Sequence, residues 1–343
     1  MKKWDNKSIF TAFLLLIPIG FIIYFFMSEN GLMDLIENAT NFNKWWLAAG
    51  VLCQFSNVAI DAYILYKLTH NYNKNYTFRQ SLKTTAVGQF FSVITPGAVG
   101  GQPMQLYCMS KQKLDTGVST SCLIQKFLVY QTTITFYSLI VMLCNLDLFR
   151  GDLKGWMLSL AAFGFISHAI VVIFIFMFSV NKQLTDKIIK FFFNFLSKIK
   201  IIKNPPEKIK KVEQQLEYFH ESNSKLYKNK KLLLTTFSLT TLQLTLIFLI
   251  PYMIYRSFNF LGASVFDMIT GQAFVTMVSS FVPLPGGSGA AEGSFYVFFS
   301  LFFTENTIKS AILIWRIITY FLNIIIFAPF SNISKISDSS EKI

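Results

Sequence analysis

Two basic residues, Lys126 and Arg316, lie inside apolar segments that are long enough to cross a lipid bilayer. A charge at that depth costs roughly 3 kcal/mol on insertion scales, so such residues usually face a cavity or a partner. Lysine and arginine are the side chains that bind phosphate oxygens, and a lipid headgroup is the phosphate that a membrane supplies. The two residues therefore predict a site for the charged part of a lipid.

Three further ionisable residues lie in or beside apolar segments. Glu292 stands where a helix is expected to restart, and a carboxylate there is stabilised by the helix dipole and the first N–H groups. The sequence leaves open whether Glu292 caps this helix, pairs with Lys126 or Arg316, or carries a proton. Asp61 either takes part in function or reaches the interface. His168 is expected to be a satisfied core residue or to hydrogen-bond between helices, and the alternative is that it carries a proton.

Two apolar segments, residues 84–109 and 265–303, are interrupted by proline and glycine and resemble each other. Each contains Gly-Gln-x-Phe, then a Pro/Gly break, then a short polar restart. Related breaks that enter from opposite faces are typical of inverted repeats, whose broken helices meet near the midplane and form the transport site. The N–H groups of each restart suit a phosphate. The predicted substrate-binding residues are Gln89, Pro96, Gly97, Gly100, Gly101, Gln102, Lys126, Gln272, Pro285, Gly286, Gly287, Ser288, Glu292 and Arg316.

The same breaks have a purely structural interpretation, in which proline and glycine only permit tight turns and bind nothing. Pro103 suits the first position of the restarted helix, where a missing N–H costs nothing. Gln89 and Gln272 either satisfy the broken backbone or contact a headgroup. The sequence does not choose between these roles.

The composition indicates a chain surrounded by lipid, because 53% of the 343 residues are hydrophobic, 14% are charged, and the apolar residues form uninterrupted blocks. We predict an all-α polytopic membrane protein with about six spanning helices plus two Pro/Gly-broken re-entrant helix pairs related as inverted repeats. One domain is expected over 1–343, with repeats at about 1–145 and 156–335. The predicted spans are 9–27, 45–66, 118–145, 156–180, 232–255 and 308–329.

Lysine placement predicts the topology. Residues 181–231 contain thirteen lysines, and the positive-inside rule places such a loop in the cytoplasm. That placement requires the first broken segment, 84–109, to return to the side from which it enters. By the same logic we expect 265–303 to enter from the outside and return there, which puts both termini in the cytoplasm of a multi-pass cell-membrane protein. Within the loop, residues 188–199 mix aromatic residues with lysines and suit an interfacial helix on anionic lipid.

Several functional classes are not expected. The net charge of +13 comes from loops that meet anionic headgroups at the cytoplasmic face, so we predict no direct contact with nucleic acid. Cys53, Cys108, Cys122 and Cys144 lie in apolar stretches without the spacing of metal ligands. We therefore expect no metal, no cofactor and no catalytic residue.

Three motifs carry a resemblance to a known family. They are Thr95-Pro96-Gly97 followed by residues 100–103, the run at 283–293, and Arg316-Ile317-Ile318-Thr319-Tyr320. The chain resembles, over nearly its whole length, the transmembrane, flippase-like domain of the lysylphosphatidylglycerol synthetase (multiple peptide resistance factor) family. By this match Tyr320 joins the predicted site, and Lys126 corresponds to the base of an intramembrane Glu-Arg-like element.

The chain departs from that family at charged positions. The family's first motif commonly reads Gly-Gly-Glu with an arginine three residues later, and this chain has Gln102 and Gln105 there. Gln125 likewise stands where the acid beside Lys126 would be. A role that needs charge at these places is therefore not expected, and the substrate is expected to differ.

The resemblance implies translocation of an anionic, aminoacylated or glycosylated lipid between leaflets, with a phospholipid, a glycolipid or a polyprenyl-linked molecule as substrate. Full-length synthetases of the family also carry a cytoplasmic aminoacyltransferase domain, which we do not expect in this chain, so we expect no intrinsic lysyl transfer. Two alternatives stay open: the membrane part of a phosphatidylglycerol lysyltransferase, and a scaffold on which a separately encoded synthase or glycosyltransferase docks through 181–231. The sequence does not define an oligomeric state.

Overall fold

The computed structural model describes residues 42–145, 155–188, 228–280 and 282–331, together with scattered positions from 191 to 224. These residues form helices and their connections, without a β-strand among them, which confirms the all-α prediction for this part of the chain. The predicted span at 9–27 lies outside the described residues. So do nearly all of the expected interfacial helix at 188–199 and most of the basic loop at 181–231.

Four helical stretches are long and apolar enough to cross a membrane, and each overlaps a predicted span. A fifth predicted span is also helical, as α8 (Gly155–Val180). The chain is thus a multi-pass membrane protein. The four stretches are α3 (Lys44–Tyr72), α6 (Thr116–Cys144), α11 (Lys230–Phe248) running into α12 (Ile250–Ser257), and α15 (Glu305–Arg316) running through η1 (Ile317–Phe321) and α16 (Leu322–Phe327) into η2 (Ala328–Ser331).

Polar side chains fix where the spanning helices begin, and apolar side chains cover their outer faces. Asn43 and Asp115 cap α3 and α6, since their side-chain oxygens accept from the N–H groups of Trp45 and Val118. The outward faces of α6, α8 and α11 are apolar, as expected where the surrounding solvent is lipid. Exposed apolar side chains on these faces include Phe136, Ile140, Phe163, Ile170 and Leu242.

Both broken segments form pairs of short helices. The first consists of α4 (Phe78–Ile94) and α5 (Gly101–Lys111), and the second of α13 (Val265–Ser279) and α14 (Ala290–Phe299). The two helices of each pair pack closely at the glycine of the Gly-Gln-x-Phe motif. A Cβ on Gly88 would overlap Gln105 of α5, and a Cβ on Gly271 would overlap Phe298 of α14. Pro103 is the third residue of α5 and not the first, but its missing N–H is still one that a helix leaves unpaired.

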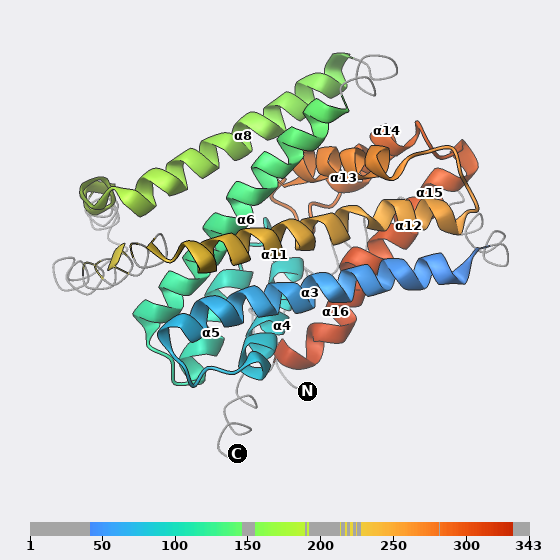
Figure 1. Ribbon diagram of the computed structural model, residues 1–343. Coiled ribbons are helices and arrows are strands. Elements are labelled where there is room, and N and C mark those ends of the chain that lie inside the picture. The colour runs from blue at the N-terminus through green and yellow to red at the C-terminus, as the bar shows by residue number, and fades with distance from the viewer. Residues whose placement is uncertain are drawn as a thin grey trace, which may run out of the picture.

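The two pairs start at opposite ends of the molecule (Figure 1). Helix α3 runs antiparallel to α11 and α12, because the N–H of Asn43 donates to the Ser257 carbonyl at 2.9 Å while Leu68 packs near Leu232 at the other end. A short connection joins the end of α3 to the start of α4, and another joins the end of α12 to the start of α13. The first pair therefore enters the helix bundle from one end, and the second pair enters from the opposite end.

The two breaks meet inside the bundle. Pro96 and Pro285 form an isolated antiparallel bridge between the two chain segments. Each proline is followed by two residues with positive φ, namely Gly97 (58°) and Ala98 (57°) in the first break and Gly286 (60°) and Gly287 (62°) in the second. Matching positions of the two breaks thus lie against each other.

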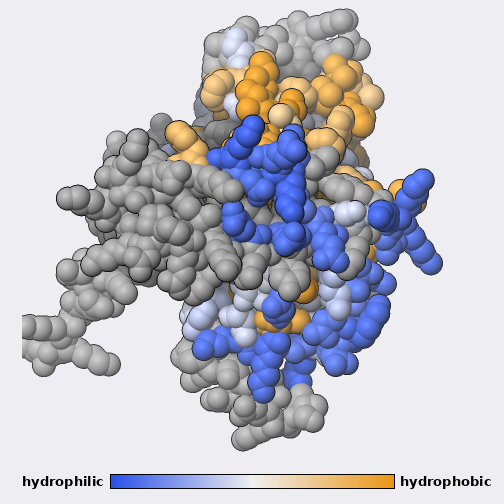
Figure 2. Space-filling model, turned by 90° about the vertical axis from the view of Figure 1, so that its left-hand side faces the viewer, coloured by the Kyte–Doolittle hydropathy of each residue, from blue (hydrophilic) through white to orange (hydrophobic). Residues whose placement is uncertain are grey.

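The end from which α4 enters is hydrophilic (Figure 2). Its exposed side chains include many more basic than acidic residues, as expected at the cytoplasmic face of a membrane protein. The exposed basic residues include Lys74, Arg79, Lys111, Lys113, Lys182, Lys187, Lys228, Lys230 and Lys231.

This distribution predicts that Lys74 faces the cytoplasm and Leu261, which is 74% exposed at the opposite end, faces outward. Single cysteines at these two positions, in a Cys144→Ala background, would be labelled with a membrane-impermeant maleimide. Cys53, Cys108 and Cys122 are buried and should stay silent. We expect Leu261→Cys to react in intact cells and Lys74→Cys only after permeabilisation; the reverse pattern would show that the orientation is wrong.

Candidate functional site

A cavity of about 370 Å³ lies among the helices beside the first break. Its wall comes from α3, α4, α5, α6 and α11 and from Ala98 in the break. Thr319 of η1 and Asn323 of α16 complete it. Most of its polar lining consists of carboxamides and one ion pair. The lining residues are Gln54, Asn57, Asp61, Gly88, Gln89, Ser92, Val93, Ala98, Gln102, Gln105, Leu123, Lys126, Phe127, Tyr130, Gln243, Ile247, Thr319 and Asn323.

The ion pair joins Lys126 of α6 to Asp61 of α3, with 2.8 Å between Nζ and Oδ2. Their side chains are only 16% and 10% exposed. Asp61 thus points into the bundle, and the interpretation in which it reaches the membrane interface is wrong. Lys126 has a carboxylate partner, so the cavity contains a neutral pair where the sequence suggested a free cation.

Seven carboxamide side chains line the same cavity. Gln89 and Gln102 were predicted from the sequence as site residues, whereas the other five were not. A signal was present on α3, because Gln54, Asn57 and Asp61 are spaced by three and four residues and share one helix face. Such a polar stripe on a spanning helix indicates a cavity or a partner. The five missed carboxamides are Gln54, Asn57, Gln105, Gln243 and Asn323.

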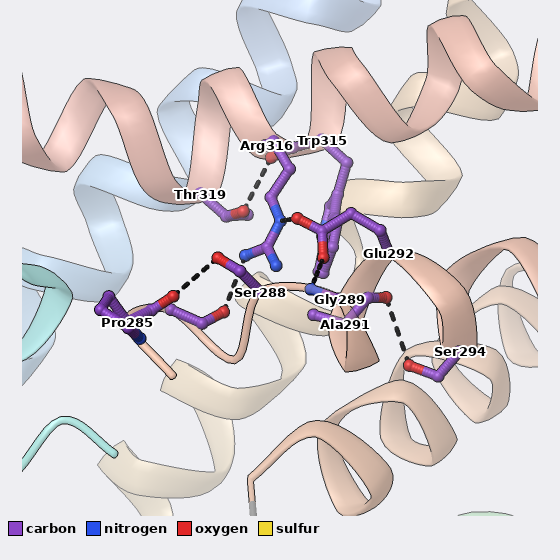
Figure 3. A network of polar contacts seen from close by, with 10 residues as sticks. Pro285, Ser288, Gly289, Ala291, Glu292, Ser294, Trp315, Arg316 and Thr319 are labelled. Atoms are coloured by element: carbon purple, nitrogen blue, oxygen red, sulfur yellow. Dashed lines mark hydrogen bonds and ion pairs between the residues drawn. The ribbon is translucent and has the colours of Figure 1, made fainter. Parts of the chain in front are cut away.

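A second polar centre, formed by Arg316 and Glu292, stabilises the backbone of the second break (Figure 3). The Nε of Arg316 lies 2.6 Å from Oε1 of Glu292, and its Nη1 donates to the Gly286 carbonyl at 3.0 Å. The other carboxylate oxygen of Glu292 accepts from the Gly289 N–H at 2.6 Å. Arg316 and Glu292 are 4% and 1% exposed. Glu292 therefore both caps α14 and pairs with Arg316, two of the roles that the sequence left open.

This network corrects the expected phosphate site at the second break. Arg316 is not a free cation, because Glu292 neutralises it. The N–H of Gly287 donates to the Leu284 carbonyl at 2.9 Å, so it is not available to an anion. The first turn of α14 is occupied by the protein's own carboxylate. At the first break, the Gly101 N–H lies 3.4 Å from the Ala98 carbonyl oxygen.

The predicted site residues are thus divided between two places. Gln89, Gln102 and Lys126 line the cavity, and Pro96, Gly97, Gly100 and Gly101 lie in the break beside it. The residues around the second break are Pro285, Gly286, Gly287, Ser288, Glu292, Arg316 and Tyr320. Gln272 belongs to neither group, since its side-chain amide donates to Thr276 within α13.

The other ionisable residue singled out in the sequence, His168, lies on α8. Its Nδ1 hydrogen-bonds to the side-chain amide of Gln131 on α6. It thus makes a contact between helices, as expected, and it does not line the cavity.

Removing Arg316 alone should destabilise the protein, because Glu292 would then be buried without its partner. We expect Arg316→Met to lower stability by about 3–5 kcal/mol. The double variant Arg316→Met/Glu292→Gln should recover much of this loss, since glutamine still has an oxygen for the Gly289 N–H. Melting curves of detergent-solubilised protein would measure both. Equal melting temperatures for wild type and Arg316→Met would contradict the pairing.

Gly286 should not tolerate alanine. Its φ is +60°, and an added Cβ would overlap the ring of Tyr320. We expect Gly286→Ala to cost at least about 1–2 kcal/mol from the backbone alone. Gly293→Ala is the matched control, because nothing lies within 4 Å of its added Cβ and the position is inside α14. Similar melting temperatures for the two variants would argue against the turn at Gly286.

Comparisons with known proteins agree with this architecture. Residues 9–326 match the family described as "Lysylphosphatidylglycerol synthase TM region". The chain is 26% identical over 284 residues to a "UPF0104 membrane protein" of Archaeoglobus fulgidus, covering 80% of this chain and 83% of that protein. It is 25% identical over 343 residues to an "Uncharacterized protein MG306 homolog" of Mycoplasma pneumoniae, covering 94% of this chain and 86% of that one. The chain therefore belongs to the family of the lysylphosphatidylglycerol synthase transmembrane region, as the sequence motifs indicated.

Proposed function

We propose that this protein moves the headgroup of an anionic, aminoacylated or glycosylated lipid between the leaflets of the cell membrane. The observation that carries the proposal is the polar cavity among the spanning helices, with the ion pair of Asp61 and Lys126 in its wall. A polar headgroup loses its hydrogen bonds to water when it enters hydrocarbon, which costs several kcal/mol per group. A cavity lined with hydrogen-bonding side chains lowers that barrier.

The arrangement of the broken helices supports a re-entrant, inverted-repeat architecture. The α4–α5 and α13–α14 pairs start at opposite ends of the bundle, and matching prolines of their breaks meet. In transporters built from inverted repeats, the substrate site lies at such a meeting point, and rocking of one repeat against the other exposes it to each side in turn. We place the basic end in the cytoplasm, where it contacts anionic headgroups.

We assign headgroup binding to the cavity and not to the pair of free cations expected from the sequence. Asp61 offers a carboxylate and Lys126 an ammonium group, and each is bound to the other when no headgroup is present. The network of Arg316 and Glu292 then has a structural role, in that it holds the second break next to the first. A lipid headgroup is thus received mainly by α3, α4, α5, α6 and α11.

The description of the matching family also favours a second candidate function, as the membrane part of a phosphatidylglycerol lysyltransferase. In that case the purified protein, alone or with a separately encoded synthase, would transfer lysine from lysyl-tRNA to phosphatidylglycerol. The first candidate requires lipid movement without any aminoacyl donor. A transfer assay and a translocation assay on the same preparation distinguish the two.

Translocation would be tested with the full chain in liposomes, using acyl-labelled phosphatidylglycerol, lysylphosphatidylglycerol and glucosyldiacylglycerol and dithionite bleaching of the outer leaflet. We expect at least one of these lipids to cross faster than in protein-free liposomes. The variant Asp61→Asn/Lys126→Met should slow that lipid by roughly tenfold, equivalent to about 1.4 kcal/mol in the barrier.

The control variant is Lys182→Met/Glu217→Gln, which removes an ion pair of 3.1 Å whose side chains are 53% and 73% exposed. It should transport at the wild-type rate, since exposed pairs contribute little. Replacing both members of the Asp61–Lys126 pair leaves no single buried charge, so the protein should still fold. If no lipid moves faster than in protein-free liposomes, the proposed function is wrong.

A further inference from the structure

The charges in the wall of the cavity cancel. Its lining contains one acidic side chain, Asp61, and one basic side chain, Lys126, and these are bonded to each other. A headgroup with a net charge would have to leave its counter-charge behind or break this pair, and an uncompensated charge in a low-dielectric site is expensive. The electrostatics of the cavity therefore fit an uncharged group better than a phosphate or a lysyl ammonium.

Three carboxamides in the wall are buried and have no internal partner. Asn57 of α3, Gln105 of α5 and Gln243 of α11 are 6%, 5% and 5% exposed. None of the three side chains hydrogen-bonds to another residue within the part of the chain that the structure describes. Their polar atoms face the cavity, so a group that enters it can supply the hydrogen bonds that the protein does not. These side chains point to an occupant that completes their hydrogen bonds.

The chemistry of the carboxamide defines that occupant. Each side chain presents two N–H donors and a carbonyl acceptor, so its best complement is a group that both accepts and donates. A hydroxyl group does both, whereas a phosphate only accepts and an ammonium only donates. The rings of Phe127 and Tyr130 add an apolar surface to the same wall, which suits the C–H face of a ring-shaped ligand.

The size of the cavity limits the occupant to one small group. Its volume of about 370 Å³ lies near the lower end of the roughly 300–1,000 Å³ of small-molecule sites. The three carboxamides come from α3, α5 and α11 and line the same cavity.

We propose that the cavity selects an uncharged, hydroxyl-rich headgroup, of the class of a single sugar on a glycolipid. This inference rests on the proposed function and names its substrate class. Asn57, Gln105 and Gln243 bind the hydroxyl groups. Gln54 and Asn323, which are already hydrogen-bonded to each other at 3.0 Å, complete the polar wall.

The test compares rates for different headgroups in the liposome assay, with glucosyldiacylglycerol, phosphatidylglycerol, lysylphosphatidylglycerol and phosphatidylcholine carrying the same acyl label. We expect the glucolipid to move at least about tenfold faster than the other three. Asn57→Leu and Gln243→Met, which keep the side-chain shape, should each reduce this ratio by roughly tenfold. Gln125→Met is the matched control: it removes a buried carboxamide that bonds to Tyr72 outside the cavity, and the ratio should not change.

The outcomes separate this inference from the proposed function. Equal rates for all lipids, above those of protein-free liposomes, would leave translocation in place and overturn the headgroup selection. A preference for phosphatidylglycerol or lysylphosphatidylglycerol would overturn it as well.

If no lipid moves, the inference is tested by measuring how much each lipid raises the melting temperature of the protein in detergent. Selective stabilisation by glucosyldiacylglycerol, present in the wild type and lost in Asn57→Leu, would show that the cavity binds the sugar although the protein does not translocate it. No difference between the lipids would show that the cavity holds water only, and the inference would fail.

Discussion

The central constraint on this fold is that a helix broken among membrane-spanning helices must find partners for its free backbone groups inside the protein. At the first break the partner is an uncharged side chain: the Thr95 hydroxyl donates to the Phe91 carbonyl and accepts from the Gly100 N–H. At the second break the partners are charged side chains: Arg316 donates to the Gly286 carbonyl, and Glu292 accepts from the Gly289 N–H. In this way part of the irregular backbone at each break finds hydrogen-bond partners within the protein.

The two polar centres differ in whether their hydrogen-bonding groups face the cavity. Around the second break Glu292 pairs with Arg316 and accepts from Gly289, and neither Glu292 nor Arg316 lines the cavity, although the Nη2 of Arg316 is buried without a partner in the part of the chain that the structure describes. In the cavity the buried carboxamides of Asn57 and Gln243 have no partner among the described residues. A buried ion pair that bonds to the backbone of a turn stabilises that turn, whereas free hydrogen-bonding groups that line a cavity are suited to binding. This difference separates the structural centre from the binding site.

One helical stretch connects these centres. Arg316 ends α15, and the π-helix η1 starts at the next residue. Tyr320 of η1 lies beside Arg316 and against the turn at Gly286, whereas Thr319 and Asn323 line the cavity. π-Helical turns are rare and are frequently found at functional sites. Here one helical stretch contributes to the second break on one side and to the cavity on the other.

The sequence by itself determined the features that depend on local composition: the apolar segments, the positions of the two breaks, and the family. Only the tertiary structure decided which charges meet. Lys126 pairs with Asp61, 65 residues earlier in the chain, and Arg316 pairs with Glu292, 24 residues earlier, and neither distance in sequence has a periodicity that reveals the contact. The same holds for the carboxamides. The sequence shows a polar stripe on α3, but only packing places Gln105 of α5 and Gln243 of α11 around the same cavity. Periodicity reports which face of a helix is polar, but the identity of its partner depends on how the helices pack.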